Sequence, residues 1–229
     1  MKRLPFFLYS SLLVLFAGAP HLFAQEILTA GRYFDQISAN YAHIDDYQAH
    51  ITITQKDSVM RGTIYYKKPD LMRIDFSDPA NQVIVTNGQM LTIYIPKQSA
   101  VFQQTLKKGS SGTGAGLASS EGLQLLRKNY SIAYLENPNP VPLDPGSSER
   151  VVKLKLEWRS TDEGFRQLEL DIGENGLIRR IIGVTANYER IQFDFTDIKT
   201  NQNIPVGRFK YDPPQTANTY PNFLFVPES

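Results

Sequence analysis

Residues 62–96 read GTIYYKKPDLMRIDFSDPANQVIVTNGQMLTIYIP, and this stretch decides the fold. Apolar and polar side chains alternate through it, as they do in a β-strand, where successive side chains point to opposite faces. Met72, Ile74 and Phe76 therefore share one face, while Arg73 lies on the other. The stretch predicts antiparallel strands that together present one apolar face.

A tight turn at Asn87-Gly88 is expected to join two of these strands. Asn and Gly both tolerate positive φ, which a type I′ hairpin turn requires at its two central positions. The apolar alternation resumes after the turn at Leu91, Ile93 and Ile95. We therefore predict a hairpin that extends the same apolar face across further strands.

The N-terminus has the order of a secretory signal. Lys2 and Arg3 precede an apolar run over 4–16, and small residues follow up to Ala24. The run is shorter than the roughly 20 residues that span a bilayer, so cleavage after Ala24 is expected rather than anchoring. The sequence has no cysteine, which excludes disulfides and a lipid-modified N-terminal cysteine. We predict removal of 1–24 and an exported, periplasmic protein with a single domain over 25–229.

Composition and motifs argue against several functions. The formal net charge is +1, so no bulk attraction to nucleic acid is expected. His43 and His50 have no metal-ligand spacing, and no nucleophile or zinc-protease motif appears. The Gly-rich run 112–116 lacks the Gly-Lys-Ser/Thr ending of a phosphate loop. We expect no metal, no cofactor and no enzymatic activity.

Two helices and a series of strands are predicted along the chain. Residues 27–44 have helical spacing, and Ser119-Ser120-Glu121 is a plausible start for a second helix that ends near Asn129. A Pro-rich stretch, 136–149, is expected to be an extended, exposed loop. The strands are predicted at about 48–56, 59–67, 71–77, 81–86, 90–95 and 99–105, and then at 152–158, 168–172, 178–186 and 191–195.

These one-sided strands have more apolar surface than two helices can cover. About eleven strands at roughly 4.8 Å spacing make a sheet roughly 50 Å wide, whereas two helices, each about 10 Å across, cover about 20 Å of it. The pattern leaves two alternatives open. One is a filled two-layer sandwich, and the other is a single curled sheet with the helices over its apolar face.

The chain resembles a known family in three stretches. In 62–96 a strand ends in Lys68-Pro69 and is followed by an Asn-Gly hairpin. Residues 165–178, FRQLELDIGENGLI, and 191–214, which begin IQFDFTDIKTNQNIP and close FKYDPP, are similar to the late hairpin and the C-terminal part of that family. The family is the LolA periplasmic lipoprotein carriers.

The resemblance implies a fold and a function. The fold is mainly β with two or three helices, in which a single curved antiparallel sheet forms an incomplete (half) β-barrel closed by a helical lid. The function is that of a monomeric periplasmic chaperone that carries acylated lipoproteins from the inner to the outer membrane. Its partners would be an inner-membrane lipoprotein-releasing ABC transporter and an acceptor at the outer membrane whose identity the sequence leaves open.

The resemblance also assigns roles to residues. The acyl chains would contact the apolar strand faces, for which the candidates are Ile64, Tyr66, Met72, Ile74, Phe76, Leu91, Ile93, Ile95, Leu168 and Leu170. Leu123 and Leu126 would belong to the lid helix, with the Gly-rich 109–116 as its hinge. Lys68 stands where the family has an arginine that hydrogen-bonds lid backbone, and lysine lacks the planar fork for paired bonds. Ile74→Asp is expected to abolish lipid uptake, whereas Arg73→Asp, on the opposite face, is not.

Two other functions remain compatible with the same fold. One is a sensor or regulatory module in which lipid, or a misplaced lipoprotein, changes a protein contact. The other is a carrier of glycolipids or other hydrophobic ligands.

Overall fold

The computed structural model describes residues 28–106, 114–161 and 163–223. Its helices are α1 (Ala30–Ala42) and α2 (Ser120–Asn129), with short 3₁₀ turns η1 (Pro96–Gln98), η2 (Gly114–Leu117) and η3 (Val206–Phe209). Neither helix in this described part is long and apolar enough to cross a membrane. The predicted signal segment, 1–24, lies outside the described residues.

The strands of the described chain form one sheet. They are β1 (Asp46–Gln55), β2 (Ser58–Lys67), β3 (Leu71–Asp78), β4 (Val83–Asn87), β5 (Met90–Ile95), β6 (Ala100–Thr105), β7 (Tyr130–Tyr134), β8 (Val141–Pro142), β9 (Arg150–Trp158), β10 (Phe165–Gly173), β11 (Ile178–Thr185), β12 (Arg190–Thr200) and β13 (Asn218–Pro221). Their order is β13-β6-β5-β4-β3-β2-β1-β12-β11-β10-β9-β7, with β8 beside β9. The sheet is open, so the expectation of a mainly β fold with a single sheet and two helices is confirmed.

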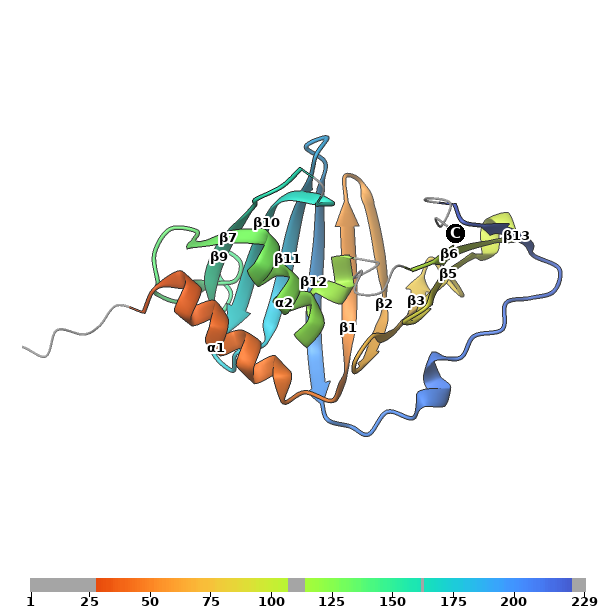
Figure 1. Cartoon of the computed structure of the whole chain (residues 1–229), viewed down its shortest axis with the longest axis horizontal. Helices are drawn as coiled ribbons and strands as arrows, with labels where there is room; N and C mark the ends of the chain where they lie inside the picture. Colours follow the sequence, from red (N-terminus) through yellow and green to blue (C-terminus); the bar gives the residue numbers. More distant parts are fainter. Residues whose placement is uncertain (1–27, 107–113, 162, 224–229) are drawn as a thin grey trace, which may run out of the picture.

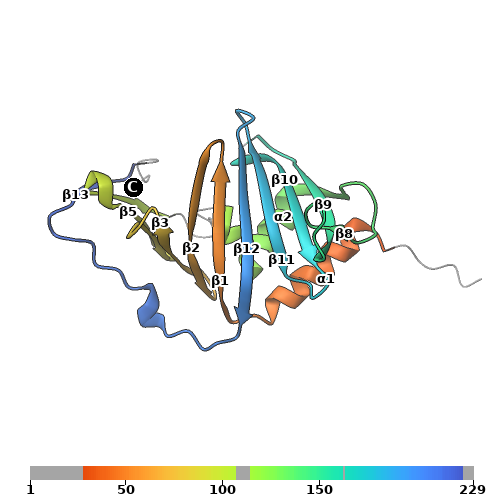
Figure 2. The ribbon, with the colours of Figure 1, turned by 180° about the vertical axis from the view of Figure 1, so that it is seen from behind.

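Two antiparallel meanders make up most of this sheet. One runs from β1 to β6 and the other from β9 to β12, and they join where β1 pairs with β12. Figure 1 shows the helices in front of the second meander, and Figure 2 shows the same sheet from behind. The face on which the helices lie is called the inner face here, and the opposite face the outer face.

Strand register explains why the inner face is apolar. Paired residues of antiparallel strands share a face, and Ile64 pairs with Ile74 as Ile51 pairs with Phe195. Both pairs are buried and belong to one core cluster that spans the two meanders. The two-residue alternation in the sequence therefore reappears as one continuous buried surface.

Each helix begins at a side-chain cap and buries one apolar stripe. The hydroxyl of Thr29 accepts a hydrogen bond from the Arg32 amide, and that of Ser119 accepts one from the Gly122 amide. The inward stripe of α1 is Phe34, Ile37 and Tyr41 together with Ala30, and that of α2 includes Leu123 and Leu126. The start of α2 agrees with the sequence prediction.

The strap, defined as residues 201–217, covers the outer face of the first meander. Asp46 holds its start, because the buried carboxylate accepts hydrogen bonds from the amides of Gln202 at 2.7 Å and Ile204 at 3.0 Å. Farther along, the guanidinium of Arg73 donates to the carbonyls of Arg208 and Lys210, both at 3.1 Å. After the strap, β13 pairs with β6 in parallel and closes that edge of the sheet.

One local prediction is wrong, and a second needs an addition. Only Gly88 has positive φ in the β4–β5 turn, and the side chain of Asn87 instead accepts hydrogen bonds from the amides of Gln89 and Met90. The predicted type I′ turn is therefore wrong. The Pro-rich stretch is mostly exposed, but it docks on the outer face, where Asp144 forms two hydrogen bonds with Arg180 at 2.8 and 3.1 Å.

Candidate functional site

The predicted binding residues of β2 and β3 lie together on the inner face. Ile64, Tyr66, Met72, Ile74 and Phe76 are all buried and all belong to the core cluster. The register joins them in cross-strand pairs, since Ile64 lies opposite Ile74 and Tyr66 opposite Met72. This part of the sheet is an apolar wall without charged side chains among these five residues.

Beyond β3 the inner face becomes partly accessible. Ile84 pairs with Ile93, and Ile93 pairs with Phe102, so these side chains continue the same face across β4, β5 and β6. Ile84, Ile93, Ile95 and Phe102 are half-buried, and we call them the apolar strip. Leu91, which is on this face, is buried. In Figure 1 the two helices lie over the second meander and leave β3 to β6 without a helix.

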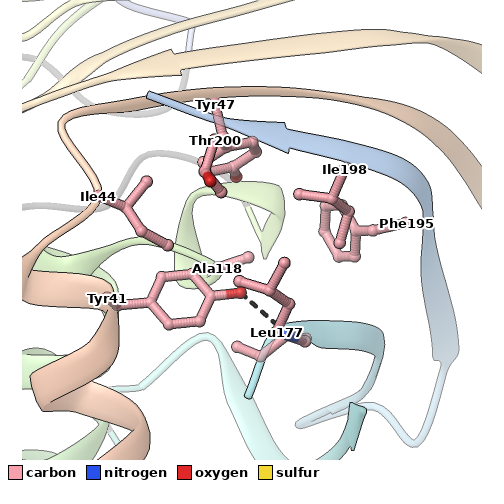
Figure 3. Close-up of a pocket in the computed structure, with 9 residues that line it drawn as sticks. Tyr41, Ile44, Tyr47, Ala118, Leu177, Phe195, Ile198 and Thr200 are labelled. Carbon is pink, nitrogen blue, oxygen red and sulfur yellow. Dashed lines mark hydrogen bonds between the residues drawn. The ribbon is translucent and has the colours of Figure 1, made fainter. Parts of the chain in front are cut away.

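The inner face of the second meander packs against the helices. Leu168 and Leu170 are fully buried in the same core cluster as Phe34 and Leu123 of the helices. A cavity under α1, lined by Tyr41, Ile44, Tyr47, Ala118, Leu177, Ile178, Phe195, Ile198 and Thr200, has a volume of about 10 Å³ (Figure 3). That is room for about one water molecule. An acyl chain does not fit in this cavity while α1 and α2 stay in place.

Tyr41 is one of the residues that line this cavity. Its hydroxyl accepts a hydrogen bond from the Ile178 amide at 2.9 Å, drawn as the dashed line in Figure 3. Burial raises the pKa of Tyr41 to about 12, so the hydroxyl stays neutral at physiological pH. The contact fixes the C-terminal half of α1 against the start of β11.

Lys68 reaches the end of α1. Its ammonium donates to the carbonyl oxygen of Ala42 at 2.6 Å and lies 3.1 Å from a carboxylate oxygen of Asp45. Ala42 is the last residue of α1, where unpaired carbonyls favour a cation. In this structure Lys68 therefore contacts α1, whereas the predicted lid residues Leu123 and Leu126 belong to α2.

A polar contact on the inner face holds α2 instead. The hydroxyl of Tyr66 on β2 donates to the carboxylate of Glu121 in the first turn of α2. Burial and this carboxylate both raise the pKa of Tyr66 well above its usual range. The sequence placed Glu121 only at the start of the second helix and predicted no contact with Tyr66, because only the tertiary fold brings the two together. At the other end of α2, Arg127 pairs with Asp35 of α1 at 2.6 Å.

The other polar groups of the described chain form no cluster of the kind that holds a metal ion. Nowhere in 28–106, 114–161 or 163–223 do three or more His, Cys, Asp or Glu side chains gather as metal ligands would. His43 Nδ1 lies 2.8 Å from the Ala39 carbonyl, and His50 pairs with Asp197 on the surface. The most distinctive chemistry of the inner face is its hydrocarbon surface.

Comparisons with known proteins agree with this architecture. An outer-membrane lipoprotein carrier protein from Hahella chejuensis is 26% identical over 186 residues, which cover 79% of this chain and 84% of that protein. One from Dechloromonas aromatica is 24% identical over 165 residues, or 72% and 73% of the two chains. Among solved structures, an uncharacterized conserved protein from Thermus thermophilus matches with a TM-score of 0.53 and 14% identity, covering 84% of this chain and 98% of that one, which supports the fold alone.

The sequence model of one family extends over most of the chain. It matches residues 43–212, a range that begins at the end of α1 and ends beyond the strap contacts of Arg73. This range contains every strand from β1 to β12. The chain therefore belongs to the LolA family, the outer membrane lipoprotein carrier proteins.

Proposed function

We propose that this protein binds the acyl chains of lipoproteins on its inner face and carries them across the periplasm from the inner to the outer membrane. The observation that carries the proposal is the half-exposed apolar strip, which continues the buried wall of Ile64 and Ile74 beyond the cover of the helices. Membership of the lipoprotein carrier family supports the same reading.

An acyl chain that crosses water without a covering surface has a large unfavourable free energy. Each CH₂ group that leaves water contributes about 0.8 kcal/mol, so an acyl chain of common length costs on the order of 10 kcal/mol to carry exposed. Aliphatic and aromatic walls shield the chain without directional bonds. Such a wall accepts acyl chains of different lengths and releases them when an acceptor offers a better apolar environment.

The half-barrel and the helical lid are part of this proposal. In the proposed mode a short acyl segment lies on the apolar strip, whereas deeper binding along Leu168 and Leu170 requires α2 to move away from the sheet. Tyr66 and Glu121 hold the N-terminal turn of α2, and Lys68 holds the end of α1. We assign these two contacts to the closed state of the lid.

A binding assay with matched variants tests the site. A fluorescent fatty acid or a triacylated lipopeptide should bind the protein with one-to-one stoichiometry. Phe102→Asp places a carboxylate on the strip and should weaken binding at least tenfold, because a desolvated charge opposes an acyl chain. Gln103→Asp on the same strand is the control, since Gln103 pairs with Thr92 on the outer face. Equal effects of the two changes, or no uptake by the unaltered protein, would rule the site out.

The cellular role needs a separate test. The proposed form is a single domain over 25–229, released into the periplasm by cleavage after Ala24, that receives cargo from an inner-membrane ABC transporter and delivers it to an outer-membrane acceptor. Depletion of the protein should leave lipoproteins at the inner membrane. A sensor of the same fold would instead alter a stress response before lipoproteins are mislocalised.

A further inference from the structure

One row of paired residues crosses the first meander on its inner face. The successive pairs are Ile64 with Ile74, Ile74 with Ile84, Ile84 with Ile93, Ile93 with Phe102, and Phe102 with Tyr220. We call these six residues the cross-strand row. It runs perpendicular to the strands from β2 to β6 and ends on β13, at the edge of the sheet that lies away from the helices (Figure 1).

Exposure to solvent increases along this row. Ile64 and Ile74 are 0% and 1% exposed, the residues on β4, β5 and β6 are half-buried, and Tyr220 is 49% exposed. A polar group placed at the Ile74 end would lose its water, which is costly, whereas at the Tyr220 end it would stay hydrated. The row therefore has a buried end suited to hydrocarbon and an exposed end suited to a polar group.

Tyr220 is held at the exposed end by aromatic contacts. Its ring stacks on that of Phe102 with centroids 5.3 Å apart, and Phe223 meets Phe102 edge-on at 5.5 Å. A tyrosine presents both an apolar ring and a hydroxyl that can donate a hydrogen bond, so it suits the boundary between an apolar surface and water. Tyr220 thus ends the apolar row with a hydrogen-bond donor.

The length of the row matches that of one acyl chain. From Phe102 on β6 to Ile74 on β3 there are three strand spacings of about 4.8 Å, or about 14 Å in all. The hydrocarbon core of a bilayer is about 30 Å thick and contains two leaflets, so one acyl chain extends over about 15 Å. A chain that begins beside Tyr220 therefore ends near Ile74.

We propose that an acyl chain lies across the strands along this row, with its terminal methyl group directed toward Ile74 and its ester or amide carbonyl at Tyr220, whose hydroxyl donates a hydrogen bond to it. The inference rests on the proposed function and adds to it the direction of the chain and a binding residue on β13. Tyr220 lies beyond 43–212, the range that the family model matches. In this orientation the polar part of a lipoprotein remains in water at the β13 edge.

Paramagnetic broadening of backbone amide signals tests the direction. The probes are two stearic acids, one with a doxyl spin label near the carboxyl group and one with the label near the terminal methyl group. The first should broaden Tyr220 and Phe102 most, and the second Ile74 and Ile84. The reverse order, or equal broadening by both probes, would overturn the direction alone. No broadening by either probe would refute the proposed function and the direction with it.

Tyr220→Phe tests the hydrogen bond. This variant keeps the aromatic ring and removes the hydroxyl, so it should bind a triacylated lipopeptide about fivefold more weakly. Its binding of diphenylhexatriene, an apolar dye without a carbonyl group, should not change. Tyr188→Phe is the matched control, because Tyr188 is 72% exposed in the turn between β11 and β12, and it should alter neither affinity. Unchanged lipopeptide binding by Tyr220→Phe, or an equal loss for both ligands, would overturn the role of the hydroxyl.

Discussion

Neighbouring residues on β3 make different contacts, because their side chains lie on opposite faces of the sheet. Ile74 is buried in the inner wall, while Arg73 points to the outer face and binds the strap through two carbonyls. Arg208 of the strap also pairs with Asp75 at 2.7 Å. The sequence predicts that Arg73→Asp leaves lipid uptake intact. Since that change also releases the strap, Gln103→Asp is the better control for the outer face.

Asp46 is the residue on which the strap depends most. Its buried carboxylate accepts hydrogen bonds from two strap amides, and Lys67 lies 3.3 Å from it. Asp46→Ala leaves these donors without their acceptor and should lower the free energy of unfolding by about 2–3 kcal/mol. Urea denaturation measures the loss. Asp57→Ala, in the exposed turn between β1 and β2, should change stability by less than about 0.5 kcal/mol.

Asp171 gives the unfolding free energy an unusual pH dependence. Burial raises the pKa of its carboxyl, although Lys153 at 2.9 Å opposes the shift. The unfolded chain then loses the proton near pH 3.9 while the folded protein still holds it. The folded state binds more protons in this window, so the contribution of Asp171 to stability is present below it and is lost as the pH rises through the folded pKa.

Asp171→Asn isolates this contribution. Chemical denaturation of both proteins between about pH 3 and pH 7 gives the difference in unfolding free energy. The stability of the natural protein relative to the variant should fall as the pH rises. A relative stability that rises with pH would show that Lys153 dominates and lowers the pKa.

The second helix, α2, is held by a partly buried contact at its N-terminal end and by an exposed ion pair at the other end. Tyr66→Phe removes the hydroxyl that donates to Glu121 and should cost about 1 kcal/mol. The amides of Leu123 and Leu126 should exchange with solvent faster in this variant. Asp35→Asn removes a partner of the exposed Arg127 pair and should change the exchange little. Equal protection in both variants would mean that packing alone holds α2.

Most elements could be predicted because their side chains alternate with a clear period. The strands from β1 to β6 and from β9 to β11 agree with the sequence expectations to within three residues, whereas β12 continues to Thr200, well beyond the predicted end at 195. β7 was not predicted, since Tyr130–Tyr134 directly follows a helix and is short. The strap was not predicted either, because its contacts depend on isolated residues such as Asp46 and Arg73 rather than on a periodic pattern.

The candidate site was only partly predictable for a related reason. The two-residue alternation of strand side chains places Ile74 and Ile93 on one face. It does not indicate which part of that face the helices cover. Leu168 and Leu170 have the same pattern as the strip, yet they lie beneath α1 and α2 in the core. Coverage is decided by where helices distant in sequence pack, which alternation along a strand does not encode.

The strap covers a second apolar surface of the molecule, which lies on the outer face of the sheet. Val83, Val85 and Val101 are buried, and the register places them on the outer face with Arg73. A truncation after Thr200 removes the strap and should expose these residues, lower the unfolding midpoint in urea and cause aggregation detectable by light scattering. A soluble, fully stable chain ending at Thr200 would show that the strap is dispensable for folding.

The junction of β1 with β12 sets a late step in the biogenesis of this protein. A ribosome makes β1 about 140 residues before its neighbour β12, as the pairing of Ile51 with Phe195 shows. Until that partner emerges, a nascent chain presents an unpaired backbone edge in the middle of its future sheet. Folding governed by such distant pairings is slow. The complete inner wall therefore forms only after the C-terminal strand of the second meander has been made.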